Sequence, residues 1–157
     1  GAGCGLGIAE SAFDAEVQVP GRAWRIETQA LAGHIQHGTV LRDLLVRHLY
    51  AALAQAGRHA VCTSYHTLQQ QLCRWLLMNQ DCTGAHDLMM TYERLARLLG
   101  VRRAGISTTA TQLQAQGLIR DQRGHIVVTD RPGLEAAACD CYAQDLATRS
   151  TLTRVGR

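Results

Sequence analysis

Residues 91–119, TYERLARLLGVRRAGISTTATQLQAQGLI, contain two short helical patterns separated by LGV. The first helix is expected to begin at Thr91, whose hydroxyl suits an N-cap, and to end at the turn around Gly100. The second pattern predicts a helix over residues 102–116, and Gly117 can supply the left-handed residue that stops it. The stretch therefore predicts a helix, a tight turn and a second helix.

A β-hairpin is expected directly after this pair of helices. Two short apolar runs, 118–121 and 125–129, flank the bend QRG. A last helix is predicted from Pro132 to Leu146, with proline near its start, and the residues after Arg149 look frayed. This order of elements predicts a mainly α fold with a small β component (α+β), namely a winged helix-turn-helix.

A longer helical pattern precedes this region and runs from about Ala30 to Gly57. Its apolar stripe consists of Leu41, Leu45, Leu49, Ala52 and Ala56. The stripe needs a partner, and a twin helix in a dimer is favoured over packing within the same domain. Thr63 or Ser64 then suits the N-cap of a further helix that ends near Asn79.

The N-terminal residues give weaker signals. AEVQVPGRAWRIET, residues 15–28, alternates apolar and polar residues around Pro20 and Gly21, which weakly predicts a hairpin. Two such strands do not make a stable sheet alone. No apolar run approaches the ~20 residues of a membrane span, and without an apolar leader the cytoplasm is the expected compartment.

The basic charge of the chain is local. All sixteen basic residues are arginine; residues 91–133 hold seven of them against three acids, a net of +4, whereas residues 1–36 hold two against four acids, a net of −2. Localised arginine favours a polyanionic partner, although a solvated face would carry the same charge.

The predicted helix 102–116 has two different faces. One carries Ile106, Ala110 and Leu113 and suits a core. The side chains of the other face are small except at the N-terminal end, which would let the helix backbone come close to a DNA major groove. At that end, Arg103 can donate two hydrogen bonds to one guanine. The candidates for phosphate contacts or weak reading of base edges are Arg102, Ser107, Thr108 and Thr111, with Arg120 and Arg123 of the hairpin for the flanking backbone.

Several segments carry a resemblance to a known family. QLCRWLLMNQD, LMMTYERLARLLGVRRAGISTTATQLQAQGLI, RGHIVVTDRPGLEAAACDCY and the long helix before them resemble the C-terminal part of the CRP/FNR family of bacterial transcription regulators, from about Val17 to Tyr142. The resemblance implies a homodimer joined through the long helix, with one recognition helix per protomer in the major groove of double-stranded DNA at an inverted repeat. RNA polymerase is left open as a further partner.

The resemblance also shows departures from the family. Its members usually carry a complete β-roll sensor, but here residues 1–36 resemble only the last strands of the roll. The chain is therefore divided into this remnant, a dimerisation helix (37–62), a winged helix-turn-helix domain (63–146) and a flexible tail (147–157). We expect effector sensing to be lost or vestigial, with no cyclic nucleotide bound. Because only Cys4 precedes the long helix, we expect no iron–sulfur cluster.

A further departure lies in the recognition helix. Many family members have Glu directly after the arginine that reads the first base, but this chain has Ala104 after Arg103. No carboxylate is therefore present there to accept a hydrogen bond from cytosine N4. The methyl group of Ala104 can instead contact the methyl group of thymine. The resemblance implies base contacts by Arg103 and Thr108, and the methyl group of Ala104 is added to these base-reading residues. The half-site is therefore expected to differ from the common family consensus.

Cysteine and histidine residues suggest chemistry less strongly. Cys62, His66 and Cys73 can share a helical face, which permits a metal or thiolate–imidazole site or simple packing, but close pairs such as C-x2-C are absent. Cys139 and Cys141, two apart on a predicted helix, would point in different directions. We expect no metal and no other cofactor. No orienting carboxylate or oxyanion site accompanies Cys62 and His66, so an enzyme is not expected.

Two other functions stay open at this point. One is a truncated interaction protein whose long helix pairs with an intact relative. The other is a thiol-based redox-responsive regulator that uses Cys62, Cys73 or the pair Cys139 and Cys141.

Overall fold

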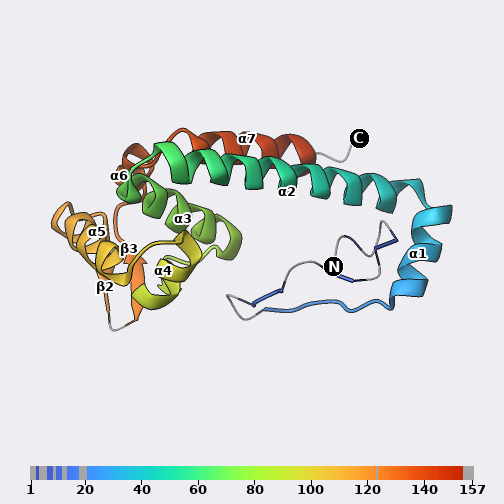
Figure 1. The fold of residues 1–157 in the computed structure, drawn as a ribbon, viewed down its shortest axis with the longest axis horizontal. Helices are drawn as coiled ribbons and strands as arrows, with labels where there is room; N and C mark the ends of the chain where they lie inside the picture. Colours follow the sequence, from blue (N-terminus) through green and yellow to red (C-terminus); the bar gives the residue numbers. More distant parts are fainter. Residues whose placement is uncertain are drawn as a thin grey trace. The chain divides into compact units, whose positions relative to one another are not determined.

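The computed structural model describes residues 21–122 and 124–153, together with Gly3, 7–8, 10–11 and 14–17. Contacts divide the chain into two compact units, Gly1–Gln55 with Thr148–Arg157, and Ala56–Ala147. The ribbon in Figure 1 shows the order of the elements, and each unit is considered by itself below. No helix in the described ranges combines the length and the apolar character that a membrane crossing requires.

The first unit contains α1 (Thr28–His37) and the larger part of α2 (Thr39–Tyr65). The long helix predicted from Ala30 is thus interrupted at Gly38, an extended residue whose N–H donates to the carbonyl of His34 at 2.8 Å. Residues 14–17 and 21–27 form no strand, so the hairpin predicted for this segment is wrong for these residues. Two isolated strands lack the neighbours that would pair their backbones. Pro20 lies outside the described residues.

The end of α2 also differs from the prediction. Thr63 and Ser64 do not cap a new helix, because their hydroxyls donate to the carbonyl of Ala60 one turn back, and α2 continues to Tyr65. The next N-cap is Thr67, which forms a reciprocal capping box with Gln70.

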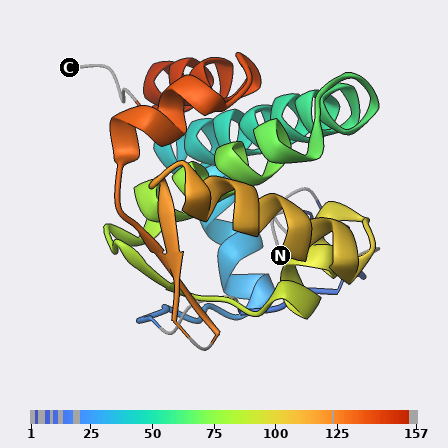
Figure 2. The same cartoon turned by 90° about the vertical axis from the view of Figure 1, so that its left-hand side faces the viewer.

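The second unit holds the rest of the fold. Its elements after α2 are α3 (Leu68–Thr83), β1 (Asp87–Met89), α4 (Tyr92–Leu99), α5 (Arg103–Ala115), β2 (Ile119–Asp121), β3 (His125–Val128), α6 (Arg131–Ala137) and the start of α7 (Cys141–Thr153). The view turned by 90° shows α5 in light orange and the strands of the hairpin in darker orange (Figure 2). The helix, turn, helix and hairpin predicted from residues 91–129 are confirmed.

The three strands form an antiparallel sheet in the order β1-β3-β2, with Leu88 opposite Ile126 and Arg120 opposite Val127. Strand β1 was not predicted, because HDLMM offers only three paired residues and gains its partner from β3, far along the chain. The sheet contributes Leu88, Ile126 and other buried residues to one core with α3, α4 and α5.

The predicted helix from Pro132 to Leu146 is two helices. Helix α6 ends at Ala137, and α7 begins at Cys141, with an extended Ala138 after α6. The predicted tail is also wrong in part, because α7 continues to Thr153. The break lies where Tyr142 and Cys139 turn inward to buried positions, so tertiary packing overrides the helical tendency of LEAAACDCY.

Candidate nucleic-acid interface

The turn between α4 and α5 is built by local sequence. Thr91 caps α4 by accepting from the N–H of Arg94 at 3.2 Å, and Glu93 places a negative charge in the first turn. Gly100 ends α4 with φ 67°, a left-handed conformation that favours glycine. The N–H of Val101 then donates to the carbonyl of Ala96 at 3.0 Å, which directs the chain into α5.

Helix α5 buries one face as predicted. Ile106, Ala110 and Leu113 are fully buried, and Thr109 is buried beside them. A Cβ atom on Gly105 would lie 3.1 Å from Leu68 of α3, so this glycine allows α3 and α5 to approach closely. The packing fixes which side of α5 remains at the surface.

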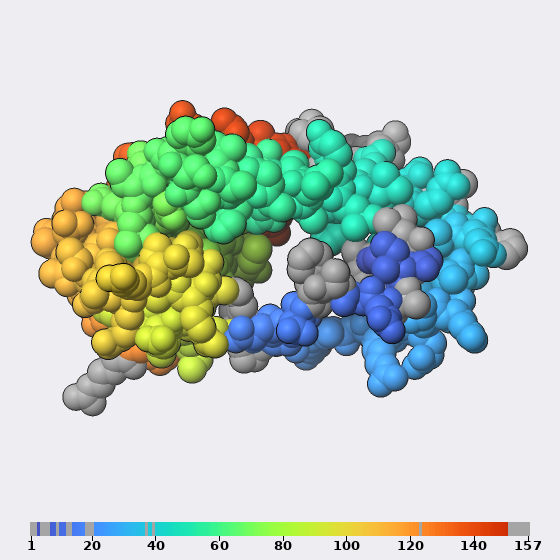
Figure 3. Space-filling model, in the orientation of Figure 1, coloured from blue at the N-terminus to red at the C-terminus, as the bar shows by residue number. Residues whose placement is uncertain are grey.

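The other side of α5 carries the predicted contact residues. Those that are exposed are Arg102, Arg103, Ala104, Thr108 and Thr111, whereas Ser107 is half-buried. The hydroxyl of Thr111 donates to the carbonyl of Ser107 at 2.9 Å, so this donor is already used within the helix. Figure 3 shows α4 and α5 in yellow and orange together at the molecular surface.

The N-terminus of α5 is electrostatically open to an anion. Arg102 occupies the N-cap position without a side-chain hydrogen bond to the helix, and the first turn contains no acid. The partial positive charge of the helix end therefore adds to the charges of Arg102 and Arg103. No carboxylate of the first turn opposes an approaching phosphate.

The hairpin lies next to this helix through β2. Arg120 on β2 is exposed, and Arg123 lies outside the described residues. Burial, together with a hydrogen bond to Asp121, raises the pKa of Tyr92 to about 12, which links α4 to the hairpin. On the neighbouring strands, Nδ1 of His125 lies 3.0 Å from Oδ1 of Asp87.

One arginine in the basic segment has a structural role. Arg131 donates to Asp81 at 2.8 Å, to Gln80 at 2.9 Å and to the hydroxyl of Tyr142 at 2.6 Å. It also pairs with Glu135 at 2.9 Å. Its charge is thus compensated within the domain, so the net charge of residues 91–133 overstates what this surface offers to a polyanion.

The predicted dimerisation residues fall into two groups on α2. Leu41, Leu45 and Leu49 are half-buried within the chain, whereas Ala52 and Ala56 are exposed. The large apolar side chains that α2 exposes are Val40, Leu44, Val46, Tyr50, Leu53, Val61 and Tyr65. Of these, Val46, Tyr50 and Leu53 belong to the first unit and lie on one side of the helix at steps of four and three residues; they are called the exposed strip below.

The thiol-bearing residues are grouped differently from the prediction. Cys73, on α3, packs in the main core and does not join Cys62 and His66. Cys139 and Cys141, expected to diverge, both face Cys62 and His66 because the helix is broken between α6 and α7. The ligand atoms of these four residues all lie within 4.8 Å of one another.

Burial favours the protonated thiol form of Cys62, Cys73 and Cys141. It raises the pKa of Cys62 to about 12, reinforced by the hydrogen bond to Cys139 and opposed by the nearby charge of Arg74. Burial also raises the pKa of Cys73 to about 12 and that of Cys141. Protonated, buried thiols are poor nucleophiles and react slowly with oxidants. Burial of these thiols therefore argues against a redox-responsive regulator that uses them in the metal-free state.

Comparisons with known proteins agree with this architecture. The family model described as Crp-like helix-turn-helix domain matches residues 70–137. No curated protein matches the chain. A crystal structure from Eubacterium rectale, assigned to a transcriptional regulator of the crp/fnr family, is similar with a TM-score of 0.56 and 21% identity over 73% of this chain.

That likeness covers 53% of the Eubacterium rectale protein, so the chain spans about half of its length. At this identity the comparison bears on the fold. The family model covers the segment from α3 to α6, which contains α4, α5 and the hairpin. Residues 70–137 are therefore a Crp-like helix-turn-helix domain, and the fold that contains it is similar to that of the Eubacterium rectale protein.

Proposed function

We propose that this chain is a sequence-specific DNA-binding transcription regulator that places α5 in the major groove. The observation that carries the proposal is the division of α5 into a buried face, built on Ile106 and Leu113, and a slim exposed face that begins with two adjacent arginines. The small side chains of the exposed face would let the helix backbone come close to the base edges in the major groove. The two arginines at the N-terminal end are long enough to donate hydrogen bonds to DNA there.

The exposed residues of α5 divide into readers and anchors. Arg103, on the first turn, donates to guanine O6 and N7, a contact worth about 1–3 kcal/mol of discrimination. The methyl of Ala104 and the side chain of Thr108 contact neighbouring base edges. Arg102 binds phosphate together with the open N-terminus of α5.

Backbone contacts flank this helix. Arg120 on the exposed side of β2 and Arg123 at the bend are assigned to the adjacent phosphates. Ser107 and Thr111 have weaker roles, because Ser107 is half-buried and Thr111 would have to give up its hydrogen bond within the helix.

A homodimer completes the proposed regulator. Two copies joined through α2 would present two copies of α5 to an inverted repeat, since the two-fold axis of the protein matches that of the DNA. We assign the contact to the exposed strip of α2, because its residues are apolar and solvent-exposed in the single chain. RNA polymerase is a further candidate partner. Residues 21–27 form no strand, and we assign this segment no effector-binding role.

The test is selection of duplexes from a random DNA pool, followed by binding of the winners and of unrelated DNA at two salt concentrations. We expect an inverted repeat, with affinity that falls steeply as salt rises. Arg103→Ala should weaken binding to the selected repeat by about 5- to 150-fold, as 1–3 kcal/mol implies, and change binding to unrelated DNA much less.

Arg22→Ala is the matched control, because Arg22 is an exposed arginine that belongs neither to α5 nor to α2. It should leave the preference for the repeat unchanged. Equal losses on both DNAs for Arg103→Ala would remove the base-reading role. Failure to enrich any sequence, combined with heterodimers formed with an intact relative, would favour the interaction protein instead.

A further inference from the structure

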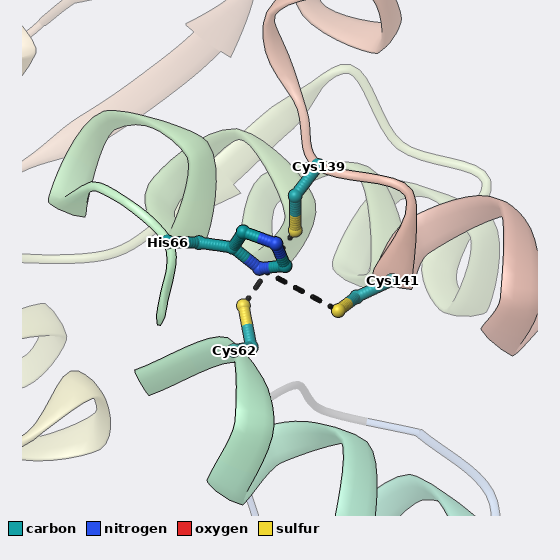
Figure 4. A group of neighbouring side chains, drawn as sticks. All are labelled: Cys62, His66, Cys139 and Cys141. Carbon is teal, nitrogen blue, oxygen red and sulfur yellow. Dashed lines mark hydrogen bonds between the residues drawn. The ribbon is translucent and has the colours of Figure 1, made fainter. Parts of the chain in front are cut away.

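A second candidate site lies in the unit Ala56–Ala147, and its residues flank the Crp-like domain at 70–137 on both sides in the sequence. It consists of Cys62 in the last turns of α2, His66 just after that helix, Cys139 between α6 and α7, and Cys141 at the start of α7. Figure 4 shows the three sulfur atoms and the imidazole directed toward one another. Residues 77 apart in sequence thus converge on one point.

The distances within this group fit a single tetrahedral ion. The sulfur atoms of Cys62 and Cys139 lie 3.6 Å apart, and the sulfur of Cys141 lies 3.6 Å from Nδ1 of His66. Bonds of about 2.3 Å to sulfur and about 2.1 Å to nitrogen place tetrahedral ligands about 3.8 Å and about 3.6 Å apart. The largest separation, up to 4.8 Å, needs only a small side-chain adjustment to reach these values.

A disulfide and simple apolar packing both fit this geometry less well than a metal ion does. A disulfide requires about 2.05 Å between sulfurs, far below the 3.6 Å observed between Cys62 and Cys139. Apolar packing usually mixes cysteine with larger side chains, but among the described buried residues Cys62, Cys139 and Cys141 form a small cluster of their own, with no aliphatic or aromatic member. Three thiols and one imidazole are a common set of zinc ligands and an unusual composition for a hydrophobic core.

The surrounding charges match those of a metal–thiolate centre. Asp145 accepts hydrogen bonds from both Arg58 and Arg74, so two guanidinium groups share one carboxylate and leave one positive charge in excess. The side chain of Arg74 is only 6% exposed, and its charge acts on Cys62 and Cys141. Zn²⁺ held by three thiolates and a neutral imidazole carries one negative charge. The excess positive charge beside the cluster would offset it.

We propose that Cys62, His66, Cys139 and Cys141 form a closed structural site for one Zn²⁺ ion. Soft thiolates with an imidazole select zinc over hard cations such as Mg²⁺ or Ca²⁺, and four protein ligands leave no open position for catalysis. On binding, three sulfur–zinc bonds and one nitrogen–zinc bond form, and the three thiol protons leave to solvent. The ion joins the end of α2 to the start of α7.

Two short segments of the chain supply all four ligands. Cys62 and His66 are one helical turn apart, and the N–H of His66 still donates to the carbonyl of Cys62 at 3.1 Å. The carbonyl of His66 accepts from the side chain of Gln71 at 2.9 Å, which fixes the backbone at the end of α2. The break between α6 and α7 then lets Cys139 and Cys141 face the same point. The zinc site does not depend on DNA binding.

The test uses the full chain, reduced and stripped of metal, and titrates it anaerobically with Co²⁺. We expect one equivalent to bind, with the strong visible absorption of tetrahedral cobalt and thiolate-to-cobalt charge transfer in the near ultraviolet. Zn²⁺ should displace the cobalt and raise the melting temperature. Cys139→Ser should lower zinc affinity by more than about 100-fold, because loss of an outer-sphere partner alone costs about 10- to 100-fold.

Cys82→Ser is the matched control, since Cys82 is exposed on α3 and lies outside the group. It should bind cobalt like the parent chain. A second variant, His66→Cys, guards against misfolding of the first: it should keep one cobalt and gain charge-transfer intensity from a fourth thiolate. Absence of tetrahedral cobalt absorption in the folded parent chain would overturn the proposal. So would equal loss of binding in Cys82→Ser and Cys139→Ser.

Discussion

Arg74 and Asp145, 71 residues apart in sequence, form a nearly buried ion pair in which Nη2 of the arginine lies 2.6 Å from Oδ2 of the carboxylate. Nε of Arg74 donates to the same oxygen at 2.9 Å, and Arg58 binds the other oxygen. The pair therefore ties α3 to the first turns of α7 and to α2. Burial alone would lower the pKa of Arg74, but the hydrogen bonds and charge of Asp145 raise it, so the guanidinium stays charged.

Asp145→Asn should strongly destabilise this domain. It removes the only negative charge in the described contacts of Arg58 and Arg74 and leaves a buried guanidinium uncompensated, at a cost of about 3–5 kcal/mol. Glu135→Gln is a suitable comparison, because its pair with Arg131 is more exposed and worth less than about 1 kcal/mol. Urea unfolding measures both. Similar small losses for the two variants would contradict a strong contribution from the buried pair.

Gly133 is required by the start of α6. A Cβ at this position would overlap the carboxylate of Asp130, which caps the helix, and would lie 2.5 Å from Cδ2 of Leu118. Gly133→Ala should therefore lower the free energy of unfolding by about 1–3 kcal/mol through crowding, with a further ~1 kcal/mol if the cap is lost.

Gly57→Ala provides the opposite case on α2. A Cβ there meets nothing within 4 Å, and alanine in a helix interior is favoured over glycine by up to about 1 kcal/mol. Thermal or urea unfolding of both variants should give changes of opposite sign. A stabilised Gly133→Ala would show that α6 can shift to accept the methyl group.

Tyr142 should make the domain sensitive to high pH. Its hydroxyl donates to Oδ2 of Asp81 at 2.9 Å and accepts from Arg131 at 2.6 Å. Burial, then the hydrogen bond and the charge of Asp81, raise the pKa of Tyr142 from 10.0 to about 12. Because the folded pKa is the higher one, this contribution to stability is complete below about pH 10 and is lost as pH rises through about 12.

Tyr142→Phe should remove that part of the pH dependence. The variant should be less stable at neutral pH by about 1–3 kcal/mol, since it leaves Asp81 and Arg131 with one partner fewer, but its stability should fall less between pH 10 and 12. Urea unfolding at several pH values checks this slope. A slope equal to that of the parent chain would assign the alkaline loss to other groups, such as Tyr92.

The parts of the fold that the sequence predicted well are those with strong local signals. Thr91, Gly100 and Gly117 mark caps and left-handed stops, and they lie where the helix pair required them. The buried face of α5 was predicted from the 3.6-residue spacing of its apolar residues alone, because residues at this spacing lie on one side of a helix and pack into the same core. These features depend on neighbours within a few residues.

The errors arose where distant partners decide the structure. Strand β1 exists because β3 pairs with it, and the gap between α6 and α7 exists because Cys139 and Tyr142 are drawn to buried positions; no glycine or proline marks that gap. Reading residues 132–146 as one helix directed Cys139 and Cys141 apart, which hid the group they form with His66. Only the spacing of Cys62 and His66 pointed toward it.

The exposed strip of α2 is the surface that we expect to be buried in the dimer. Tyr50 is 61% and Leu53 is 72% exposed in the single chain, a large apolar surface for one helix. If two copies bury this surface against each other, Leu53→Glu places two carboxylates in the interface, because a two-fold interface contains each residue twice. Loss of two buried leucines at about 1.5–3 kcal/mol each corresponds to more than about 100-fold in dimer dissociation.

Ala52→Glu is the matched variant for Leu53→Glu, since it adds the same charge at an exposed neighbour that belongs to the stripe predicted from sequence. The two side chains point about 100° apart around the helix. Sedimentation equilibrium over a range of concentrations should show Leu53→Glu as a monomer where the parent chain and Ala52→Glu remain dimers. The reverse result would return the contact to the stripe that includes Leu45 and Ala56. Monomers in all three proteins would exclude a dimer through α2, and an inverted repeat would then lose its structural basis.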